Sequence, residues 1–419
     1  MKKILLTLLL FITGLQGLQA AYILIPMDEA QKNHLKAYGV AYWILTNNLE
    51  VDWLLNYRGG SFMFKQLPAI EKELTIRGVS YSVIADGQAA NIIDEISRPE
   101  VNMDLVKLEK APKMAVYSPK DKLPWDDAVT LVLTYAEIPY DVIYDEEVIT
   151  GKLPLYDWLH MHHEDFTGQY GKFYAMYHTA AWYQEQVRTD EAMAHKLGFD
   201  KVSQMKGAVA RRIKEFTAGG GFLFSMCSGT DSYDIALASE GLDICEKMYD
   251  GDGVTSNYNT KLDFGKTFAF RDFHLSTNPM EYEFSDIDMT TQRRVPRTED
   301  VFVLFEFSAK WDPVPSMLNQ NHEQVVKGFM GQTTTFKKDY IKPEVLIMGE
   351  NKAANEARYI HGEYGKGTWT FYGGHDPEDY QHLVNEEPTD LNLHPNSAGY
   401  RLILNNVLFP AAKKKKLKT

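Results

Sequence analysis

The sequence has few cysteines and no long apolar run beyond its first residues. Cys227 and Cys245 are the only cysteines in 419 residues, so a disulfide framework is excluded, and no CxxC pair suggests structural zinc. One bridge between the two cysteines stays possible. Such a bridge would block any chemistry at either thiol.

Clustered basic residues are also scarce. The formal net charge is −13, and the only basic run extends from Lys413 to Lys418. Because phosphate contacts need clustered Arg and Lys, this balance argues against a general nucleic-acid binder. We expect the basic tail, residues 411–419, to be a solvated end, with docking to an acidic surface as the alternative.

Residues 1–20 have the pattern of a secretory signal peptide, with two lysines, an apolar stretch from Ile4 to Leu15, and small or polar residues after it. That stretch is too short to span a bilayer, and no later run reaches about 18 consecutive apolar residues. We therefore expect an exported protein, periplasmic or secreted, with no transmembrane segment in the mature chain. Loss of Lys2 and Lys3 with the peptide changes the net charge from −13 to −15.

Apolar periodicity predicts two domains in the mature chain. Residues 21–111 contain short strand and helix patterns without a phosphate loop or a catalytic cluster, which indicates a small α/β domain. In residues 112–410 strand and helix patterns alternate, which favours a parallel sheet with right-handed crossovers. Within this second domain, residues at about 251–342 are rich in β-branched and aromatic side chains broken by turns, so we expect a β-rich insertion.

The strongest local signal is GGGFLFSMCSGTDSYDIAL, residues 219–237. A buried strand is followed by a helix that starts near Asp231, so Cys227 is expected on a strand-to-helix turn. Free N–H groups of that helix favour a thiolate and amides near Ser228 can hold an oxyanion, while Gly229 allows close approach of the backbone. The alternative is that Cys227 is a small buried hydrophobic residue.

A second signal is GGHDPEDYQHL, which starts at Gly373. His375 follows a predicted strand directly, and Asp376 and Glu378 are close to it in sequence. An imidazole oriented by a carboxylate is the base that a thiol nucleophile requires. The alternative is an Asp-Pro turn with a surface histidine.

A cysteine elbow after a Gly-rich turn, with a late His followed by Pro-Glu, resembles the class I glutamine-amidotransferase-like superfamily. The later half also resembles the trehalose-utilisation branch of that superfamily, through the segments Asn321-His322, Val326-Lys327-Gly328, Tyr364-Gly365-Lys366-Gly367 and Gly374-His375. The resemblance covers about residues 113–410 and implies a flavodoxin-like, doubly wound parallel sheet. Because the elbow cysteine is the nucleophile of amidotransferases, it also implies a catalytic triad of Cys227, His375 and Glu378.

Two positions depart from the pattern of this superfamily. Ser225 stands where the family has a glycine before the neighbour of the nucleophile, and Glu378 follows His375 one residue later than in the family's His-x-Glu spacing. The trehalose-utilisation branch often lacks the elbow cysteine. Resemblance to it is therefore compatible with an inactive relative.

A third signal is HMHHEDF, residues 160–166, at the end of a predicted strand. His160 and His162 lie two apart, on one face of a strand, which is compatible with a divalent metal, but HxH alone is a weak motif and we expect no metal and no cofactor. The alternative is a polar loop with one core histidine. In an open parallel sheet ligands bind beyond the carboxyl ends of the strands, so the expected substrate-binding residues are His162, His163, Glu164, Asp165, Ser228, Gly229 and Asp376.

The segment from Ser228 to Ser232, SGTDS, resembles the SGGxDS pyrophosphate loop of asparagine synthetase B and other ATP-pyrophosphatase enzymes. It is one glycine short, and Thr230 narrows a turn whose backbone N–H groups must surround a phosphate. An ATP-using synthetase outside the cytoplasm would also lack its nucleotide. Asparagine-synthetase-like, ATP-dependent amide transfer is therefore the lesser alternative.

The leading expectation is an exported cysteine-dependent hydrolase or amidotransferase-like enzyme that acts on a small amide, ester or glycan-derived substrate. Cys227 would attack and His375 would carry the proton, while Glu378 or Asp376 would orient the imidazole. The alternative is a non-catalytic module that binds carbohydrate or a protein partner, which the aromatic content of 12% favours.

Overall fold

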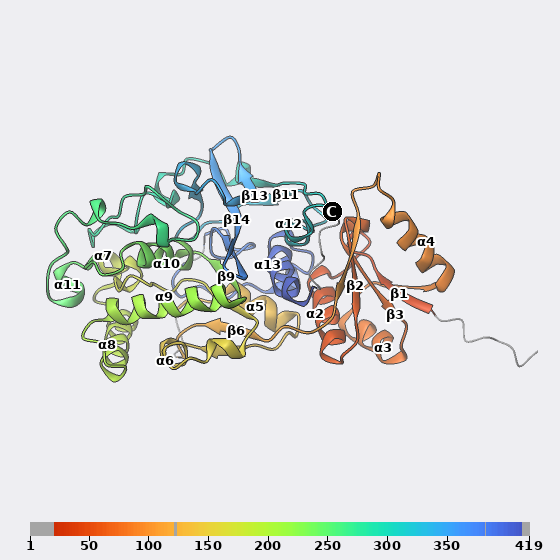
Figure 1. Cartoon of the computed structure of the whole chain (residues 1–419), viewed down its shortest axis with the longest axis horizontal. Coiled ribbons are helices and arrows are strands. Elements are labelled where there is room, and N and C mark those ends of the chain that lie inside the picture. The colour runs from red at the N-terminus through yellow and green to blue at the C-terminus, as the bar shows by residue number, and fades with distance from the viewer. Residues whose placement is uncertain (1–20, 121–123, 382, 413–419) are drawn as a thin grey trace, which may run out of the picture.

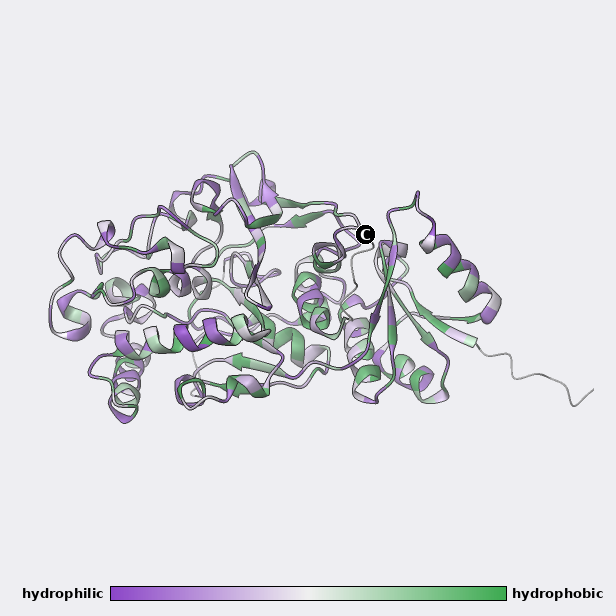
Figure 2. Cartoon of the chain, in the orientation of Figure 1, coloured by the Kyte–Doolittle hydropathy of each residue, from purple (hydrophilic) through white to green (hydrophobic). Residues whose placement is uncertain are grey.

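The computed structural model describes residues 21–120, 124–381 and 383–412. The predicted signal peptide and the lysine run of the tail lie outside these ranges. The chain is organised by two β-sheets, and the smaller one lies at one end of an elongated molecule (Figure 1). Figure 2 shows hydrophobic strands at the centre of the molecule and helices with hydrophilic outer sides. Within the described ranges, no helix is both long and apolar enough to cross a membrane.

The N-terminal unit is a five-stranded antiparallel sheet with the strand order β4-β1-β3-β2-β5. Its elements are β1 (Ala21–Ile25), α2 (His34–Thr46), β2 (Val51–Leu55), β3 (Ser61–Lys65), α3 (Pro68–Arg77), β4 (Ser82–Ala85), α4 (Asp86–Ser97) and β5 (Asp104–Leu108). Successive side chains of a strand point to opposite faces of a sheet. Accordingly, Ile23 of β1 belongs to the same buried cluster as residues of α2 and α3, whereas Leu24 packs with α4.

The second sheet has ten strands in the order β11-β10-β13-β14-β15-β9-β8-β6-β7, with β12 paired to β14. Its strands are β6 (Met114–Tyr117), β7 (Asp141–Ile143), β8 (Trp158–Met161), β9 (Phe222–Met226), β10 (Val301–Leu304), β11 (Val325–Lys327), β12 (Phe336–Lys337), β13 (Leu346–Asn351), β14 (Glu356–Tyr364) and β15 (Gly367–Tyr372). The helices of this part are α5 (Ala128–Tyr135), α6 (Asp145–Ile149), α7 (Tyr174–Tyr177), α8 (Ala181–Lys196), α9 (Val202–Gly219), α10 (Ser228–Ala238), α11 (Lys247–Asp250), α12 (Pro313–Leu318) and α13 (Ala398–Leu408).

The prediction of a flavodoxin-like, doubly wound parallel sheet is wrong, because this sheet is mixed. Parallel pairing joins β7, β6, β8, β9 and β15, but β14, β13, β12, β10 and β11 pair antiparallel. The tight turn between Tyr364 and Gly367 joins β14 directly to β15. Such a short connection produces antiparallel neighbours, since parallel neighbours need a crossover of a dozen or more residues. Strand and helix alternation did not reveal the antiparallel pairing of β10, β11, β12 and β13.

Residues 251–342, where the sequence indicates a β-rich insertion, contain only three short strands, β10, β11 and β12. Most of the segment is irregular, with turns, short 3-10 helices and the helix α12 between the strands. Several of its aromatic residues are nevertheless buried, and Phe268, Phe270 and Phe284 pack in the core beside the second sheet, whereas Trp311 is exposed. The aromatic side chains therefore fill a core without a strand ladder of their own.

Helices cover both faces of the parallel strands. Trp158 of β8 packs in one buried cluster with residues of α5 and α13, whereas Leu159 packs in another with residues of α9 and α10. This separation follows from the alternation of side chains along a strand. The parallel strands are therefore buried on both sides.

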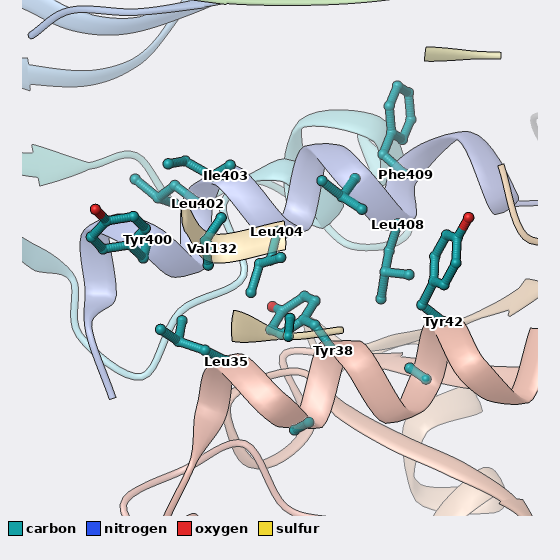
Figure 3. Close-up of a cluster of buried hydrophobic side chains, with 14 of the residues drawn as sticks. Leu35, Tyr38, Tyr42, Val132, Tyr400, Leu402, Ile403, Leu404, Leu408 and Phe409 are labelled. Atoms are coloured by element: carbon teal, nitrogen blue, oxygen red, sulfur yellow. The ribbon is translucent and has the colours of Figure 1, made fainter. Parts of the chain in front are cut away.

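The two sheets share one core at their junction. Leu35, Tyr38 and Tyr42 of α2 lie opposite Leu404 and Leu408 of α13, and all five are buried (Figure 3). Helix α2 of the N-terminal unit thus packs directly on α13. The N-terminal unit is consequently held against the rest of the protein by apolar burial.

Polar contacts reinforce this junction around the buried guanidinium of Arg401. Its Nη1 donates to the carbonyl of Met27 at 2.9 Å and its Nε donates to the hydroxyl of Tyr38 at 3.1 Å. The rings of His34 and His322 stack beside it with their centroids 4.0 Å apart. Burial lowers the pKa of His34 to about 4 and that of His322 to about 3, with Arg401 adding to both shifts.

Candidate functional site

The parallel strands β6, β8, β9 and β15 all end at the same edge of the sheet. His162 follows β8, Cys227 follows β9, and His375 comes three residues after the end of β15. We call Cys227 together with His162, His163 and His375 the carboxyl-edge site. The edge is built by backbone contacts, since the amide of Gly229 donates to the carbonyl of His162 at 2.6 Å.

Three imidazoles converge at this edge. The centroid of His375 lies 4.5 Å from that of His162 and 5.9 Å from that of His163. The centroids of His162 and His163 are 5.1 Å apart. We call these three residues the histidine cluster. The sequence placed His162, His163 and His375 at or directly after the ends of predicted strands, and the structure brings their rings together.

Asp127, which the sequence analysis missed, supports the histidine cluster from the start of α5. Its Oδ1 accepts from the amides of Val129 and Thr130 at 2.8 and 2.9 Å, as an N-cap does. The same carboxylate lies 3.3 Å from Nε2 of His160 and 3.4 Å from Nδ1 of His162. Burial opposes its ionisation, but the two imidazoles outweigh burial and hold the pKa of Asp127 well below its usual value.

The two histidines beside Asp127 respond differently to it. Burial lowers the pKa of His160, and Asp127 only partly offsets this effect. For His162 burial also disfavours the charged ring, but the negative charge of Asp127 prevails and its pKa is raised. His160 has a second fixed contact, because its Nδ1 lies 3.2 Å from the carbonyl of Phe224. It is therefore held as a structural residue of β8.

Glu164 and Asp165 follow the cluster in sequence but have different surroundings. Burial raises the pKa of Glu164 to about 7, and its Oε2 accepts from the amide of His162 at 3.0 Å. Its Oε1 lies 3.9 Å from Nε2 of His163. The carboxylate of Asp165 instead accepts from the amide of Thr167 at 2.6 Å, so it holds the turn after β8. Of these two acids, Glu164 is the one that lies beside the histidine cluster.

Cys227 occupies the turn between β9 and α10 with an unusual backbone conformation, φ +50° and ψ −143°. A non-glycine residue at positive φ is strained, and such strain often accompanies functional sites. The predicted alternative of a disulfide is not formed, since Cys227 and Cys245 are both free and buried. The thiol of Cys245 donates to the carbonyl of Thr167 at 3.3 Å.

The surroundings of Cys227 oppose a standing thiolate. Burial raises the pKa of its thiol, and the amides of Ser228 and Gln332, which bond to the sulfur, offset this only in part. Asp288 and Asp231 raise the pKa further. Helix N–H groups alone predicted the opposite effect. The local motif contains Asp231 but reveals neither the burial of the thiol nor the approach of Asp288 from a distant segment.

Asp231 and Asp288 form a buried acidic pair that sequence reasoning also missed. Thr333 joins them, since its hydroxyl donates to Asp231 at 2.8 Å and its amide donates to Asp288 at 3.0 Å. Burial raises the pKa of Asp288 to about 7, and burial with the charge of Asp288 raises that of Asp231. The pair is therefore partly protonated near neutral pH.

Glu378 and Asp376, the predicted orienting acids, have other contacts. Glu378 lies 3.2 Å from Nδ1 of His394 and 3.8 Å from the ammonium of Lys327. Asp376 is fully buried and accepts from the amide of Glu378 at 2.8 Å, so it holds the Asp-Pro turn. The structure thus brings Cys227 and His375 to one edge but directs the carboxylate of Glu378 to His394.

The SGTDS segment forms the first turn of α10. The amide of Thr230 donates to the carbonyl of Cys227 at 3.1 Å, and that of Ser232 donates to Asp231 at 2.9 Å. Gly229 has no room for a phosphate, because a Cβ there would lie 2.5 Å from the carbonyl oxygen of His162. These amides are engaged within the protein. The contacts therefore do not favour a pyrophosphate loop.

Two cavities are relevant to ligand binding. A small one of about 20 Å³ lies beside the histidine cluster, and its walls include His163, Glu164, Trp125 and Lys206. A larger groove of about 720 Å³ lies between the N-terminal unit and the segment 304–324. The larger groove does not contain the carboxyl-edge site, so size alone does not identify the reactive position.

Comparisons with known proteins leave the family open. No protein-family model and no curated protein matches the chain. Among solved structures, the chain has 11% identity and a TM-score of 0.36 to the cytoplasmic protein STM3548 from Salmonella typhimurium, covering 72% of this chain and 100% of that one. The cytoplasmic protein STM1381 from Salmonella typhimurium LT2 has 12% identity and a TM-score of 0.36, and the match covers 72% of this chain and 100% of that one.

A fragment of a larger enzyme is also similar. A catalytic mutant of Gan42B, a GH42 beta-galactosidase from G. stearothermophilus, has 12% identity and a TM-score of 0.26. The match covers 65% of this chain and 28% of that one. TM-scores this low establish neither a shared fold nor a shared function.

Proposed function

We propose that the chain is an exported hydrolase or amidotransferase-like enzyme that cleaves a small amide, ester or glycan-derived substrate at the carboxyl-edge site. The observation that supports it best is the strained φ of +50° at Cys227, on the same sheet edge as three imidazoles. Strain of this kind is retained where the surrounding structure holds a side chain in a required position. The resemblance to class I glutamine amidotransferases points to the same residue.

In the proposed reaction, Sγ of Cys227 forms a bond to the acyl carbon of the substrate. Because the pKa of the thiol is raised, the S–H proton leaves during the attack and passes to an imidazole, for which His375 is the candidate. The imidazolium then gives this proton to the leaving amine or alcohol as the C–N or C–O bond breaks. Water, deprotonated by the same imidazole, hydrolyses the thioester and restores the thiol.

The backbone donors nearest to the sulfur are the amides of Ser228 and Gln332. They are the candidates for stabilising the oxyanion of the tetrahedral intermediate. His162, His163, Glu164 and Ser228 are kept as candidate substrate contacts, whereas Asp165 and Asp376 hold turns and Gly229 packs against the carbonyl of His162. The contacts of Glu378 with His394 leave no orienting role for it in this scheme.

The test uses the mature chain with p-nitrophenyl acetate as an ester probe and glutamine as an amide probe. We expect Cys227→Ala and Cys227→Ser to abolish turnover, and mass spectrometry of the wild type to find an acetyl group on Cys227. Cys245→Ala is the matched control, because Cys245 is also free and buried but lies in another cluster. Full activity of Cys227→Ala would exclude the covalent route.

Export is tested separately. Cell fractionation of the producing organism, followed by N-terminal sequencing, should find the protein outside the cytoplasm with a new terminus at Ala21 or close to it. A cytoplasmic protein that still begins at Met1 would contradict the signal peptide.

A second candidate function is a non-catalytic module that binds carbohydrate or a partner. The raised pKa of Cys227 favours it, because burial of the thiol, together with the charges of Asp288 and Asp231, disfavours the thiolate that catalysis requires. The groove of about 720 Å³, lined by polar side chains such as Asn56, Gln320 and Glu306, offers a surface for it. Binding to a glycan array that survives Cys227→Ala, combined with no turnover of either probe, would favour this function over catalysis.

A further inference from the structure

We propose that His162, His163 and His375 bind one divalent transition-metal ion. Each residue offers one ring nitrogen, and these three atoms all lie within 4.8 Å of one another. In a tetrahedral site with metal–nitrogen bonds of about 2.0–2.1 Å, ligand nitrogens are roughly 3.4 Å apart. The distances between the three ring nitrogens therefore need to shorten by only about 1 Å or somewhat more, which rotation of the side chains supplies.

The local structure positions His162 for this role. Its Nδ1 faces Asp127 at 3.4 Å, while no hydrogen-bond partner of Nε2 is found in the described residues. A proton on Nδ1, directed at the carboxylate, leaves the lone pair of Nε2 for the ion. Metal-binding histidines usually donate their other ring N–H to a carboxylate or carbonyl in this way.

Asp127 is itself held firmly. The amides of Val129 and Thr130 fix its Oδ1 at the start of α5, and its Oδ2 lies 3.3 Å from Nε2 of His160. The carboxylate is therefore a rigid support for His162 and is not available to move toward an ion. This arrangement distinguishes the histidine cluster from a chance group of buried imidazoles.

The ligand set indicates the kind of ion. Three neutral imidazoles suit zinc, cobalt, nickel or copper, whereas magnesium and calcium prefer oxygen ligands. Three protein ligands leave a fourth position for water or a substrate atom. Oε1 of Glu164 lies 3.9 Å from Nε2 of His163. Its carboxylate would therefore contact the group in the fourth position or the imidazole of His163.

Two other groups of potential ligands are less suitable. In the group of Asp243, Cys245 and Asp250, the ammonium of Lys201 lies 2.6 Å from Asp243 and 2.9 Å from Asp250, so a cation already fills the position. In the group of Asp127, His160 and His162, both nitrogens of His160 face fixed oxygen atoms. The histidine cluster is thus the best candidate in the described residues.

The proposed metal site shares His375 with the proposed hydrolase but does not depend on its activity. An ion bound to His375 takes the lone pair that would otherwise accept the proton of Cys227. The two inferences therefore compete for one side chain. Metal loading should inhibit any turnover that depends on Cys227, and metal binding itself is measurable even if the chain hydrolyses nothing.

The test is a titration of the full mature chain with Co²⁺, after treatment with a chelator and desalting, followed by visible absorption. We expect one equivalent to bind with the spectrum of a tetrahedral nitrogen-ligated site, and Zn²⁺ to displace it. His162→Gln, His163→Gln and His375→Gln should each weaken binding at least a hundredfold. Asp127→Asn should weaken it by roughly 10- to 100-fold through His162.

Three controls keep the result interpretable. His274→Gln, a change at an exposed imidazole, should bind Co²⁺ like the wild type. Cys227→Ala should also bind Co²⁺ like the wild type. Loss of Co²⁺ binding in that variant would identify a sulfur ligand and overturn the three-imidazole site. Zn²⁺ should raise the melting temperature of the wild type and not of the histidine variants. Absence of binding to the wild type, or equal binding by all three histidine variants, would overturn the proposal.

Discussion

The carboxylate of Asp127 lies 3.4 Å from Nδ1 of His162, which fixes the start of α5 to the end of β8. One side chain thus performs two tasks, since Asp127 also caps α5 through the amides of Val129 and Thr130. The metal-binding inference depends on the position of His162, and the catalytic proposal counts His162 among the candidate substrate contacts. The contact between Asp127 and His162 is therefore the first relationship to test.

Asp127→Ala should lower the free energy of unfolding by about 2–4 kcal/mol. Loss of the cap contributes about 1 kcal/mol, and leaving a buried imidazole without its partner contributes about 1–3 kcal/mol. Asp127→Asn keeps the cap and should lower the free energy of unfolding by less than Asp127→Ala does. Urea denaturation followed by circular dichroism measures both, with Ser397→Ala, which removes the cap of α13, as the matched comparison. A loss no larger than that of Ser397→Ala would mean that the imidazole contacts contribute nothing.

Asp288→Asn should make Cys227 react faster with iodoacetamide at pH 8. Asp288 has a pKa of about 7, so at pH 8 its charge disfavours the thiolate. Removing the charge lowers the pKa of the thiol, and each unit raises the thiolate fraction about tenfold. Peptide mass spectrometry over time gives the rate at each cysteine, with Cys245 as the internal standard. An unchanged ratio between the two rates would show that Cys227 does not experience this charge.

The positions of Cys227, His162 and His375 were predictable because each follows an apolar run that ends a strand. Parallel neighbours bring such residues to one edge, and five strands of the second sheet do pair in parallel. The antiparallel pairing of β10, β11, β12 and β13 was not predictable from alternation, because the segment before β14 has few regular elements. Periodicity describes single elements, whereas the direction of pairing depends on how distant segments meet.

The supporting acids were not predictable for a similar reason. Asp127 is one of two adjacent acidic residues in a polar segment, and its role depends on where α5 crosses the end of β8. Asp288 lies in an irregular segment and reaches Asp231 only through Thr333. The spacing between His375 and Glu378 indicated an acid nearby, but the turn at Asp376 directs Glu378 toward His394.

The stacked pair His34 and His322 should make the protein less stable in acid. Both stay neutral in the folded state, with pKa values of about 4 and 3, while an unfolded histidine titrates at about 6.5. Between about pH 6.5 and 4 the unfolded chain binds more protons, so the free energy of unfolding falls as the pH falls. His34→Gln should reduce the difference between pH 7 and pH 4.5 by up to about 2 kcal/mol. His274→Gln should not change it, and equal slopes for the two variants would contradict the assignment.

Gly229→Ala should disrupt the carboxyl edge more than any change confined to the surface. A Cβ at this position would lie 2.5 Å from the carbonyl oxygen of His162 and 2.9 Å from Oγ of Ser225. The carbonyl oxygen is backbone, so it cannot rotate away, and β8 and α10 must separate. We expect a loss of about 2–4 kcal/mol in the free energy of unfolding, typical of overpacking in a core.

Gly87→Ala in α4 is the matched control for Gly229→Ala, because nothing lies within 4 Å of a Cβ placed there. This change should be neutral or stabilise the protein by up to about 1 kcal/mol, since alanine restricts the unfolded chain. A Co²⁺ titration of the Gly229→Ala and Gly87→Ala variants measures metal binding separately from stability. Gly229→Ala should weaken binding by displacing His162, whereas Gly87→Ala should bind as the wild type does. Gly229→Ala could also prove as stable as Gly87→Ala and bind Co²⁺ as well. In that case α10 packs less tightly against the end of β8 than the 2.6 Å hydrogen bond from the amide of Gly229 to the carbonyl of His162 implies.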